Sequence, residues 1–386
     1  MHKTGIEEYY TSKGGKKLQF GFTTGTCAAA ASAAAARMLL SGQEVQTVDV
    51  MTPKGIRLNL EILETERTPE RVTCAVKKYS GDDPDVTNGV LVYASVTRKA
   101  EPGIVIDGGV GVGRVTKPGL QQKIGEAAIN RVPKQMIRQM AEEILEEYNA
   151  LCGLEIVISI PQGVELAKKT FNPNLGIVGG ISVLGTSGIV EPMSEAALIE
   201  SINVEIHQKK ALGFQRLLLA PGNYGADFMK ELHMDQKDVV KFSNFWGQTL
   251  DKAAAEGFEE ILIISHIGKV IKVAGGAMNT HSSMVDGRAE FMAAAALRAG
   301  CDGDTARDIL GCVTTDEMLN ILESRGLLQA AMEQVGQKVQ YHVCRRAGET
   351  IKTGVVIFST DRGILCKTGY ASQWLSHINR KQEETK

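Results

Sequence analysis

The stretch RLLLAPGNYG, residues 216–225, combines the two features that decide how the second half of the chain folds. Its apolar run predicts a buried strand over residues 216–220, and the proline, glycines and asparagine that follow predict a tight turn. The pattern continues on both sides, with predicted helices over residues 196–212 and 249–257 and predicted strands over residues 239–242 and 261–265. Alternation with short connections predicts a parallel sheet wrapped by helices.

The first half of the chain shows another pattern. A run of alanines broken only by Ser32 predicts a helix over residues 27–40, with Thr24 or Thr26 as its N-cap. A second helix is predicted over residues 133–148, where apolar residues recur at helical spacing after a proline. Strands are predicted over residues 47–51, 58–63, 72–76, 91–98 and 154–160. Strands with interspersed helices in this order predict an α+β layer domain.

Proline divides the chain into two parts. All ten prolines lie between Pro53 and Pro221, and none follows. A glycine-rich stretch over residues 176–188 is interpreted as the loop that leads to the second domain. We therefore expect an N-terminal α+β domain over residues 1–193 and a C-terminal α/β domain over residues 194–386. Closing strands, with an antiparallel arrangement left open, are predicted over residues 338–344, 355–358 and 363–366.

The composition excludes several classes of protein. The 386 residues include 43 Lys and Arg against 45 Asp and Glu, so charge gives no support for nucleic-acid or membrane-surface binding. The seven cysteines include no CxxC pair, which is typical of a reducing cytoplasm rather than of disulfides or zinc. No signal peptide and no stretch of 18 uncharged apolar residues is found, so we expect a cytoplasmic protein without a membrane span.

Polar residues follow each of the three strands predicted for the parallel sheet. Gly222, Asn223 and Gly225 follow the first, Ser243 and Asn244 the second, and His266 with Lys269 the third. Open α/β sheets bind ligands at the carboxyl ends of their strands, so we expect a cofactor pocket there. Each stretch taken alone is also compatible with an ordinary turn. The GxGxxG fingerprint and the acidic residue expected after the second strand are both absent.

Three further segments are candidates for binding. The hydroxyls of Thr23, Thr24 and Thr26 precede the alanine-rich helix and suit either an anion or simple capping. Cys27 would have a lowered thiol pKa if it were exposed there, although no histidine partner for a nucleophile is apparent. Residues 109–119 are compatible with a phosphate loop or with a glycine-rich turn, and their cations, Arg114 and Lys117, would suit carboxylates.

The segment NTHSSMVDGR, residues 279–288, places a histidine, an aspartate and an arginine in one polar loop before a helix. We favour a functional role for His281 and Arg288, and the alternative is an N-cap by Asp286 with a solvated Arg288. His266 and His281 are 15 residues apart with no carboxylate to complete a set, so a metal site is not expected.

An ordered set of motifs resembles one known family. The motifs are GFTTGTCAAAA, VTKPGL with GEAAIN and VP, TFNPNLGIVGGISVLGTSGIVEPMS, APGNYG, SNFWG, SHIGKVIKVAGG, NTHSSMVDGRAE and DRGIL. Together they resemble the CbiD family of cobalt-precorrin-5B C(1)-methyltransferases, in register from about Gly21 to about Gly363. The resemblance implies S-adenosylmethionine-dependent methylation of carbon 1 of a cobalt tetrapyrrole in anaerobic cobalamin biosynthesis. It also implies that the C-terminal α/β domain is Rossmann-like and three-layered.

The resemblance also suggests roles for individual residues. The methyl donor, S-adenosylmethionine, would contact Gly222, Asn223, Gly225, Ser243 and Asn244. The acetate and propionate groups of the cobalt-precorrin substrate, which itself carries the cobalt, would contact Thr23, Thr24, Thr26, Lys117, Lys269 and Arg288. His266 and His281 would orient the ring or move a proton. No nucleic-acid or membrane partner is implied, and a homo-oligomer is left open.

Two other functions remain as alternatives. One is a nicotinamide-dependent reductase, against which the missing GxGxxG counts. The other is a non-catalytic carrier of a cobalt tetrapyrrole, which would bind the macrocycle without methyl transfer.

Overall fold

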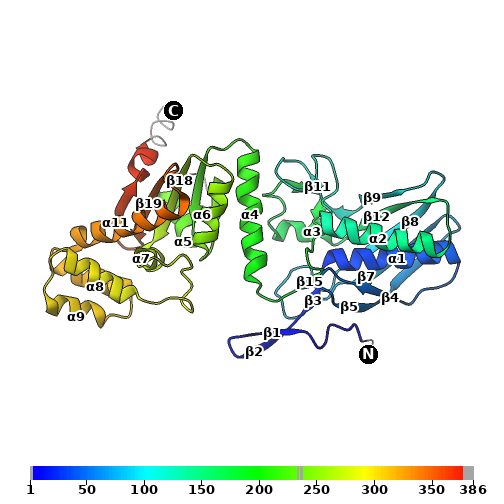
Figure 1. The fold of residues 1–386 in the computed structure, drawn as a ribbon, viewed down its shortest axis with the longest axis horizontal. Coiled ribbons are helices and arrows are strands. Elements are labelled where there is room, and N and C mark those ends of the chain that lie inside the picture. Colours follow the sequence, from blue (N-terminus) through cyan, green and yellow to red (C-terminus); the bar gives the residue numbers. More distant parts are fainter. Residues whose placement is uncertain (1–2, 233, 235–237, 377–386) are drawn as a thin grey trace. The chain divides into compact units, whose positions relative to one another are not determined.

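The chain divides into two compact units, Met1–Ser194 and Glu195–Lys386. The structure is a computed structural model that describes residues 3–232, 234 and 238–376. Figure 1 shows a mixed arrangement of helices and strands in each unit. Among the described residues, no helix is long and apolar enough to cross a membrane.

The first unit is built on a five-stranded sheet in the order β6-β7-β8-β12-β9. Its strands pair antiparallel except for β12 with β9, which run parallel. The elements of this unit are β1 Tyr10–Lys13, β2 Lys16–Gln19, β3 Gly21–Phe22, α1 Thr24–Ser41, β4 Thr47–Met51, β5 Arg57–Glu61, β6 Leu63–Arg67, β7 Arg71–Lys77, β8 Leu91–Lys99, β9 Ile104–Gly108, β10 Gly111–Val112, β11 Arg114–Val115, α2 Arg131–Glu147, β12 Gly153–Ser159, α3 Gly163–Leu166, a 3₁₀ turn Ala167–Lys169, β13 Ile177–Val178, β14 Gly180–Ile181 and β15 Ile189–Val190.

The alanine-rich helix α1 is the centre of this unit. Every alanine from Ala28 to Ala36 is buried, and the helix lies against β7 and β8 with α2 alongside it (Figure 1). Alanine has the highest helix propensity and the smallest side chain that fits a helix, so α1 can pack closely on several sides. The helix begins at Thr24, three residues earlier than predicted, because Thr23 rather than Thr24 or Thr26 is its N-cap.

The glycine-rich stretch before Glu191 is part of the first unit, and the expectation that it is only a connecting loop is wrong. Its short strands β13, β14 and β15 pair with β11, β10 and β3, respectively. These short strands can pair because glycine lets the backbones approach closely. A Cβ on Gly111, whose φ is 76°, would overlap the carbonyl oxygen of Ile160. Residues 109–119, whose sequence is compatible with a phosphate loop or a glycine-rich turn, include β10 and β11 and so take part in this pairing.

The second unit contains a five-stranded sheet in the order β17-β16-β18-β19-β20. The first four strands are parallel, and β20 pairs antiparallel with β19. Its elements are α4 Glu195–Ala211, β16 Arg216–Ala220, α5 Asn223–Glu231, β17 Val239–Lys241, α6 Trp246–Ala255, β18 Glu260–His266, α7 Ile267–Ala274, α8 Arg288–Arg298, α9 Gly303–Leu310, α10 Thr315–Ser324, α11 Leu328–Ala347, β19 Lys352–Ser359 and β20 Gly363–Gly369.

Both faces of this sheet are buried. On β16, Leu217 and Leu219 belong to a core that includes residues of α4, α6, α7 and α11. The intervening Leu218 and Ala220 belong to a second core with Phe228 of α5. This alternation explains why the strand reads as an uninterrupted apolar run, and it confirms the prediction of a parallel sheet wrapped by helices.

One predicted strand is wrong. Residues 338–344 lie inside the helix α11, because Val335, Val339 and Val343 recur every four residues and are all buried. Tyr341, which completes the apparent two-residue alternation, is exposed. The spacing of four between the valines therefore marks the buried face of a helix. The two-residue alternation that suggested a strand does not correspond to a buried face.

Candidate ligand site at the strand ends

The strand order of the second unit creates a switch point. From β16 the chain passes through α5 to β17 on one side, and then through α6 to β18 on the other side of β16. The two connections leave in opposite directions, so a crevice is expected beyond the carboxyl ends of β16 and β18. The polar residues predicted to bind a cofactor follow these strands and β17, so the structure brings them to one edge of the sheet.

The turn between β16 and α5 depends on its glycines. Gly222 has a φ of 151°, and a Cβ on it would lie 3.7 Å from Nζ of Lys269. A Cβ on Gly225 would lie 2.6 Å from the carbonyl oxygen of Ile264, so α5 sits directly on β18. Gly225 thus acts through helix packing, while a Cβ on Gly222 would have no close neighbour other than Lys269 among the described residues.

Lys269 links the loops after β18 and β16. Its ammonium donates a 2.8 Å hydrogen bond to the carbonyl oxygen of Pro221. Burial lowers the pKa of Lys269, and the nearby charge of Lys272 lowers it further. A half-buried cation beside an open glycine turn is well placed to receive a carboxylate. On the opposite side of this turn, Lys241 Nζ donates to Asn223 Oδ1 over 3.0 Å.

His266 is the N-cap of α7. Its Nδ1 accepts a 3.1 Å hydrogen bond from the backbone N–H of Gly268. Burial lowers the pKa of His266, while Asp316 and Asp361 act in the opposite direction. The ring is therefore neutral at pH 7, and because Nδ1 is an acceptor, its proton is on Nε2. His266 is thus a hydrogen-bond donor through Nε2 rather than a free base.

The loop over residues 279–287 is tied to the end of β17. The backbone N–H of Thr280 donates to Asn244 O over 3.1 Å, and Lys272 Nζ donates to Thr280 O over 3.2 Å. Ser243, just before Asn244, has a φ of 56°, which is strained for a residue with a side chain. Strained backbone of this kind tends to cluster at functional sites. Asn244 therefore helps to set the position of the loop that carries His281.

His281 and Arg288 have partners within their own loop. His281 Nδ1 lies 2.7 Å from Oγ of Ser283, and its ring is exposed. Arg288 contacts both oxygens of Asp286, at 2.8 and 3.2 Å, and this contact lowers the pKa of Asp286. The alternative in which Asp286 caps α8 is wrong, because Gly287 is the N-cap and Asp286 turns to Arg288 instead.

The three threonines predicted to bind substrate carboxylates lie in the first unit and are buried. Oγ1 of Thr23 accepts from the backbone N–H of Thr26, Thr24 Oγ1 exchanges hydrogen bonds with the backbone of Leu184, and Thr26 Oγ1 donates to Gly188 O over 2.6 Å. These hydroxyls cap α1 and hold the glycine-rich stretch against it. The structure thus engages them inside the protein, and their contact with substrate stays a prediction.

Two other candidates of the first unit are also held internally. The stem of Lys117 packs on Gly176, and its Nζ donates to Asn174 O over 3.2 Å. Arg114 makes a two-pronged contact with Asp107, at 2.7 and 2.9 Å. Cys27 is fully buried, and this burial raises its pKa to about 12. The condition for a lowered thiol pKa, exposure of Cys27, is therefore not met, because the thiolate would be desolvated.

Sequence reasoning missed Lys272 and Lys241, which orient the loops around the strand ends. Lys272 follows Lys269 by three residues and so shares its side of α7, a signal that the spacing contained. Lys241 follows two valines in a strand, and no local pattern distinguishes it. A search of the described residues for three or more His, Cys, Asp or Glu side chains grouped to hold a metal ion found none.

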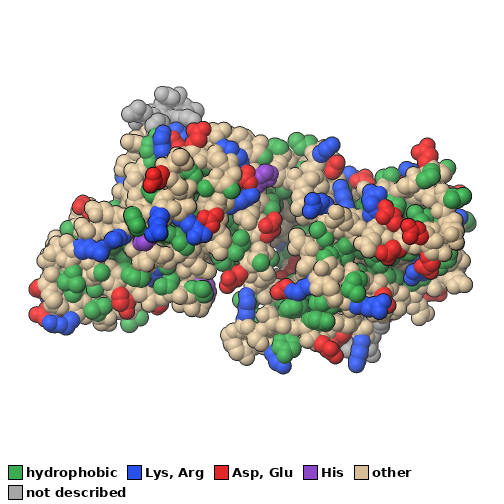
Figure 2. Space-filling model, in the orientation of Figure 1, with side chains coloured by type: hydrophobic (Ala, Val, Ile, Leu, Met, Phe, Trp, Pro, Cys, Tyr) green, Lys and Arg blue, Asp and Glu red, His purple; other side chains and the backbone are tan. Residues whose placement is uncertain are grey.

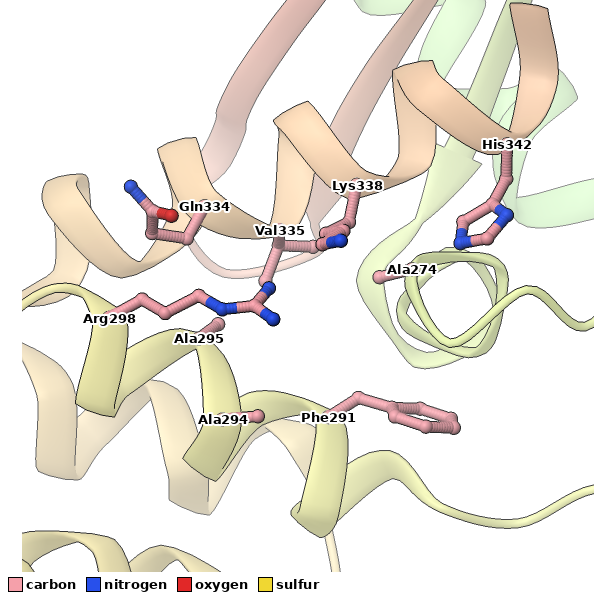
Figure 3. A pocket seen from close by; sticks show the side chains of 9 residues that line it. All are labelled: Ala274, Phe291, Ala294, Ala295, Arg298, Gln334, Val335, Lys338 and His342. Atoms are coloured by element: carbon pink, nitrogen blue, oxygen red, sulfur yellow. The ribbon is translucent and has the colours of Figure 1, made fainter. Parts of the chain in front are cut away.

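A small cavity of about 190 Å³ lies between α7, α8 and α11 (Figure 3). Arg298, Gln334, Lys338 and His342 contribute its polar groups. Burial lowers the pKa of His342, and the charges of Lys338 and Arg345 lower it further. Its volume is below the roughly 300–1,000 Å³ of typical small-molecule pockets. The residues proposed from the sequence do not line it.

Polar loops at the switch point of a parallel sheet define the class of mixed α/β proteins that bind a small-molecule ligand at that edge. The chain belongs to the CbiD family: the family model described as CbiD matches residues 11–192, and that of the CbiD C-terminal domain matches residues 279–369.

Three curated relatives align with this chain over nearly their whole length, and they share one name. A protein of Ruminiclostridium cellulolyticum is 49% identical over 91% of this chain and 92% of its own. One of Thermoanaerobacter sp. (strain X514) is 44% identical over 95% and 100%, and one of Methanocaldococcus jannaschii is 42% identical over 86% and 91%. Each is named cobalt-precorrin-5B C(1)-methyltransferase. A crystal structure of the cobalamin biosynthesis protein CbiD from Archaeoglobus fulgidus aligns with a TM-score of 0.37 and 31% identity, covering 69% of this chain and 83% of that one.

Proposed function

We propose that this chain is the enzyme that methylates carbon 1 of cobalt-precorrin-5B, giving cobalt-precorrin-6A, with S-adenosylmethionine as methyl donor. The observation that carries the proposal is the shared name of relatives 42–49% identical over nearly their whole length. We assign the donor to the switch point of the second unit, which we interpret as a Rossmann-like domain, and we propose the two compact units as the two functional domains.

The residues at the switch point suit such a donor. The open turn at Gly222 lets a ligand approach the backbone, and the first amides of α5 follow directly. Asn223, Ser243 and Asn244 offer hydroxyl and amide groups that can hydrogen-bond ribose hydroxyls. The ammonium of Lys269 beside this turn suits the carboxylate of the amino-acid moiety.

The methyl group of the donor is already activated by the sulfonium, so the protein has to align it with the substrate rather than activate it. Holding the methyl carbon in line with carbon 1 contributes several kcal/mol, on the order of the effects measured for oriented reactants. Lys269 holds the loop after β16, and Lys272 holds the loop between α7 and α8. We propose that His266 donates a hydrogen bond from Nε2 toward the substrate, and that His281 orients the ring from the adjacent loop.

The charge distribution supports a small polyanionic substrate better than a large polyanion. Figure 2 shows acidic and basic side chains interspersed on the visible face of each unit, without a surface of one sign. A macrocycle with acetate and propionate groups needs separate cations at separate points. Arg288 is proposed for this role in the second unit and Lys117 in the first, while Lys269 is assigned to the carboxylate of the methyl donor.

The decisive experiment is anaerobic incubation of the protein with cobalt-precorrin-5B and S-adenosylmethionine that carries a ¹³C-labelled methyl group. Mass spectrometry and NMR should find one labelled methyl on carbon 1 of the product. Binding of both compounds without transfer would contradict the proposal and favour a carrier. Absorbance changes with NADPH but not with the methyl donor would favour a reductase.

A further inference from the structure

A concavity of the first unit lies at the beginning of α2. It has a volume of about 640 Å³, within the range of pockets that hold small molecules. We call it the α2 pocket. Its lining includes one apolar side chain and is otherwise polar or cationic, and consists of Gln121, Gln122, Ile129, Arg131, Lys134, Gln135 and Arg138.

Three cations line this pocket from one side of α2. Arg131, Lys134 and Arg138 are spaced by three and four residues, so they follow one another along one face of the helix. Like charges at this spacing repel each other by roughly 0.2–0.5 kcal/mol per pair. Among the described residues, Lys134 has an ion-pair partner, Glu126, at 3.6 Å, and neither Arg131 nor Arg138 has one. The pocket therefore presents an excess of positive charge.

The helix dipole makes this arrangement still less favourable for the empty protein. The positive end of the dipole is at the N-terminus, where acidic residues are stabilising and cations are not. The first turn of α2 contains Arg131 and Lys134 but no acidic residue. The N-terminus of α2 therefore carries cations where acidic residues would be stabilising, and this occurs beside a pocket. Such an arrangement is expected where a bound ligand supplies the compensating negative charge.

The pocket is also held in shape without a ligand. The buried amide of Gln122 donates to Ile129 O over 2.7 Å and to Asn130 Oδ1 over 3.1 Å. The backbone N–H of Arg131 donates to Oε1 of Gln121 over 3.0 Å. The buried Ile137 of the same helix packs in the core that includes the alanines of α1. The cations therefore project from a rigid support, as a preformed binding site requires.

The spacing of the cations indicates the class of ligand. At 1.5 Å per residue, Arg131 and Arg138 are about 10 Å apart along the helix axis. A row of this length suits several anionic groups on one rigid ligand better than a single small anion. Guanidinium groups bind carboxylates through two parallel hydrogen bonds, which favours planar carboxylates as the partner groups.

We propose that the α2 pocket binds peripheral carboxylates of a tetrapyrrole through Arg131, Lys134 and Arg138. This inference rests on the proposed function, because the substrate named there is the polycarboxylate that would bind. The first unit thereby acquires a direct role in substrate recognition, separate from the strand ends of the second unit.

The test combines a binding probe with turnover. The probe is uroporphyrin III, a metal-free tetrapyrrole octacarboxylate whose fluorescence reports binding, with the dicarboxylate mesoporphyrin as a comparison. In the double variant Arg131→Gln/Arg138→Gln, we expect affinity for uroporphyrin III to fall at least tenfold, with a shallower salt dependence. The KM for cobalt-precorrin-5B should rise about as much while kcat stays within about twofold.

The control removes the same charge elsewhere in the unit. Arg71 and Lys77 are exposed at the two ends of β7, and the double variant Arg71→Gln/Lys77→Gln should leave affinity and KM unchanged. Thermal melting of both variants checks the fold. The pocket variant should be as stable as the wild type or more so, because it relieves repulsion along α2.

The outcomes separate this inference from the proposed function. If the wild type methylates cobalt-precorrin-5B but the pocket variant keeps its affinity and KM, the inference is overturned and the function stands. If the wild type does not methylate, a tenfold loss of probe affinity confined to the pocket variant supports the pocket alone. Equal losses in both double variants, or displacement of the probe by millimolar inorganic phosphate as effectively as by mesoporphyrin, would overturn the carboxylate assignment.

Discussion

The ammonium of Lys269, at the beginning of α7, donates a 2.8 Å hydrogen bond to the carbonyl oxygen of Pro221, at the end of β16. The two residues are 48 positions apart in the sequence, yet the contact closes the switch point of the parallel sheet. It fixes the turn at Gly222 against the N-terminus of α7. The proposed site for the methyl donor therefore depends on a cation that acts on the backbone as well as on a ligand.

The variant Lys269→Met should weaken binding of the methyl donor. A hydrogen bond to a charged group contributes about 1.5–3 kcal/mol, so we expect at least a tenfold loss of affinity for S-adenosylhomocysteine by isothermal titration calorimetry. Lys230→Met is the matched control, because Lys230 is an exposed lysine of α5 that pairs with Asp227 alone among the described residues. Unchanged affinity in a folded Lys269→Met protein would contradict the assignment of the site.

The pH dependence of stability should reveal His266. Its folded pKa lies below the ordinary value of 6.5 because of burial, so the unfolded chain binds the proton more readily. The stabilising contribution of the neutral ring is complete above about pH 6.5 and is lost as the pH falls through the folded pKa. His266→Asn keeps an N-cap acceptor but removes the titration. Urea unfolding from pH 7.5 to 5 should therefore show a smaller loss of stability in this variant than in the wild type.

A steeper loss in His266→Asn would overturn this interpretation. His342 also has a pKa lowered by burial, so His342→Gln serves to separate the two contributions. The two variants should each remove part of the wild-type decline, and the double variant should remove more than either.

Thr26→Val should act on stability rather than on substrate binding. The hydroxyl of Thr26 donates to Gly188 O within the buried junction of α1 and the glycine-rich stretch. Valine has a similar shape but removes this hydrogen bond and leaves Gly188 O with the backbone N–H of Thr23, so we expect a loss of about 0.5–1.5 kcal/mol in urea unfolding. The KM for cobalt-precorrin-5B at 25 °C should stay within about twofold. A tenfold higher KM with unchanged stability would restore the threonine to the substrate site.

Cys27 should be inert toward thiol reagents in the native protein. Burial raises its pKa to about 12, so the reactive thiolate is essentially absent at pH 8. Mass spectrometry after iodoacetamide treatment should find modification at the partly exposed Cys152 but none at Cys27 until the protein is unfolded. Cys27→Ala should retain methyl transfer. Rapid native labelling of Cys27, or loss of turnover in a stable Cys27→Ala protein, would contradict this prediction.

Gly111→Ala should be far more destabilising than Gly55→Ala. The two glycines have nearly the same φ, 76° and 80°, so the conformational cost of about 1–2 kcal/mol is common to both. A Cβ on Gly55 meets open space, whereas one on Gly111 would overlap Ile160 O. Urea unfolding should therefore show at least about 2 kcal/mol of additional loss for Gly111→Ala, and equal losses would contradict the close packing of β10 against the segment that follows β12.

The sequence predicts a helix or strand well where its apolar pattern is compatible with only one of the two. The strand Arg216–Ala220 has the predicted bounds, and the alanine run forms the helix α1. The predicted strand over residues 338–344 fails because a short apolar alternation is compatible with both periods. Only packing along the whole of α11, through Val335, Val339 and Val343, decides between them.

Some residues of the candidate site could be predicted from the sequence and others could not. The residues at the strand ends were predictable, because parallel connections bring the carboxyl ends of neighbouring strands to one edge. The hydrogen bonds of the Thr24 and Thr26 hydroxyls were not, because their partners, Leu184 and Gly188, lie about 160 residues away. A capping pattern has the same local sequence whether it faces a ligand or a distant loop.

By itself, the sequence indicated the main helices and strands around the parallel sheet, the change of architecture near residue 194, the residues at the strand ends and the family. These properties follow from local periodicity, turn chemistry and an ordered set of motifs. Only the tertiary structure decided which polar groups are available to a ligand. It buried Cys27, turned Asp286 toward Arg288, joined Lys269 to Pro221 and opened a pocket beside Arg131, Lys134 and Arg138. The physical reason is that burial, desolvation and hydrogen-bond partners are set by residues far apart in the chain.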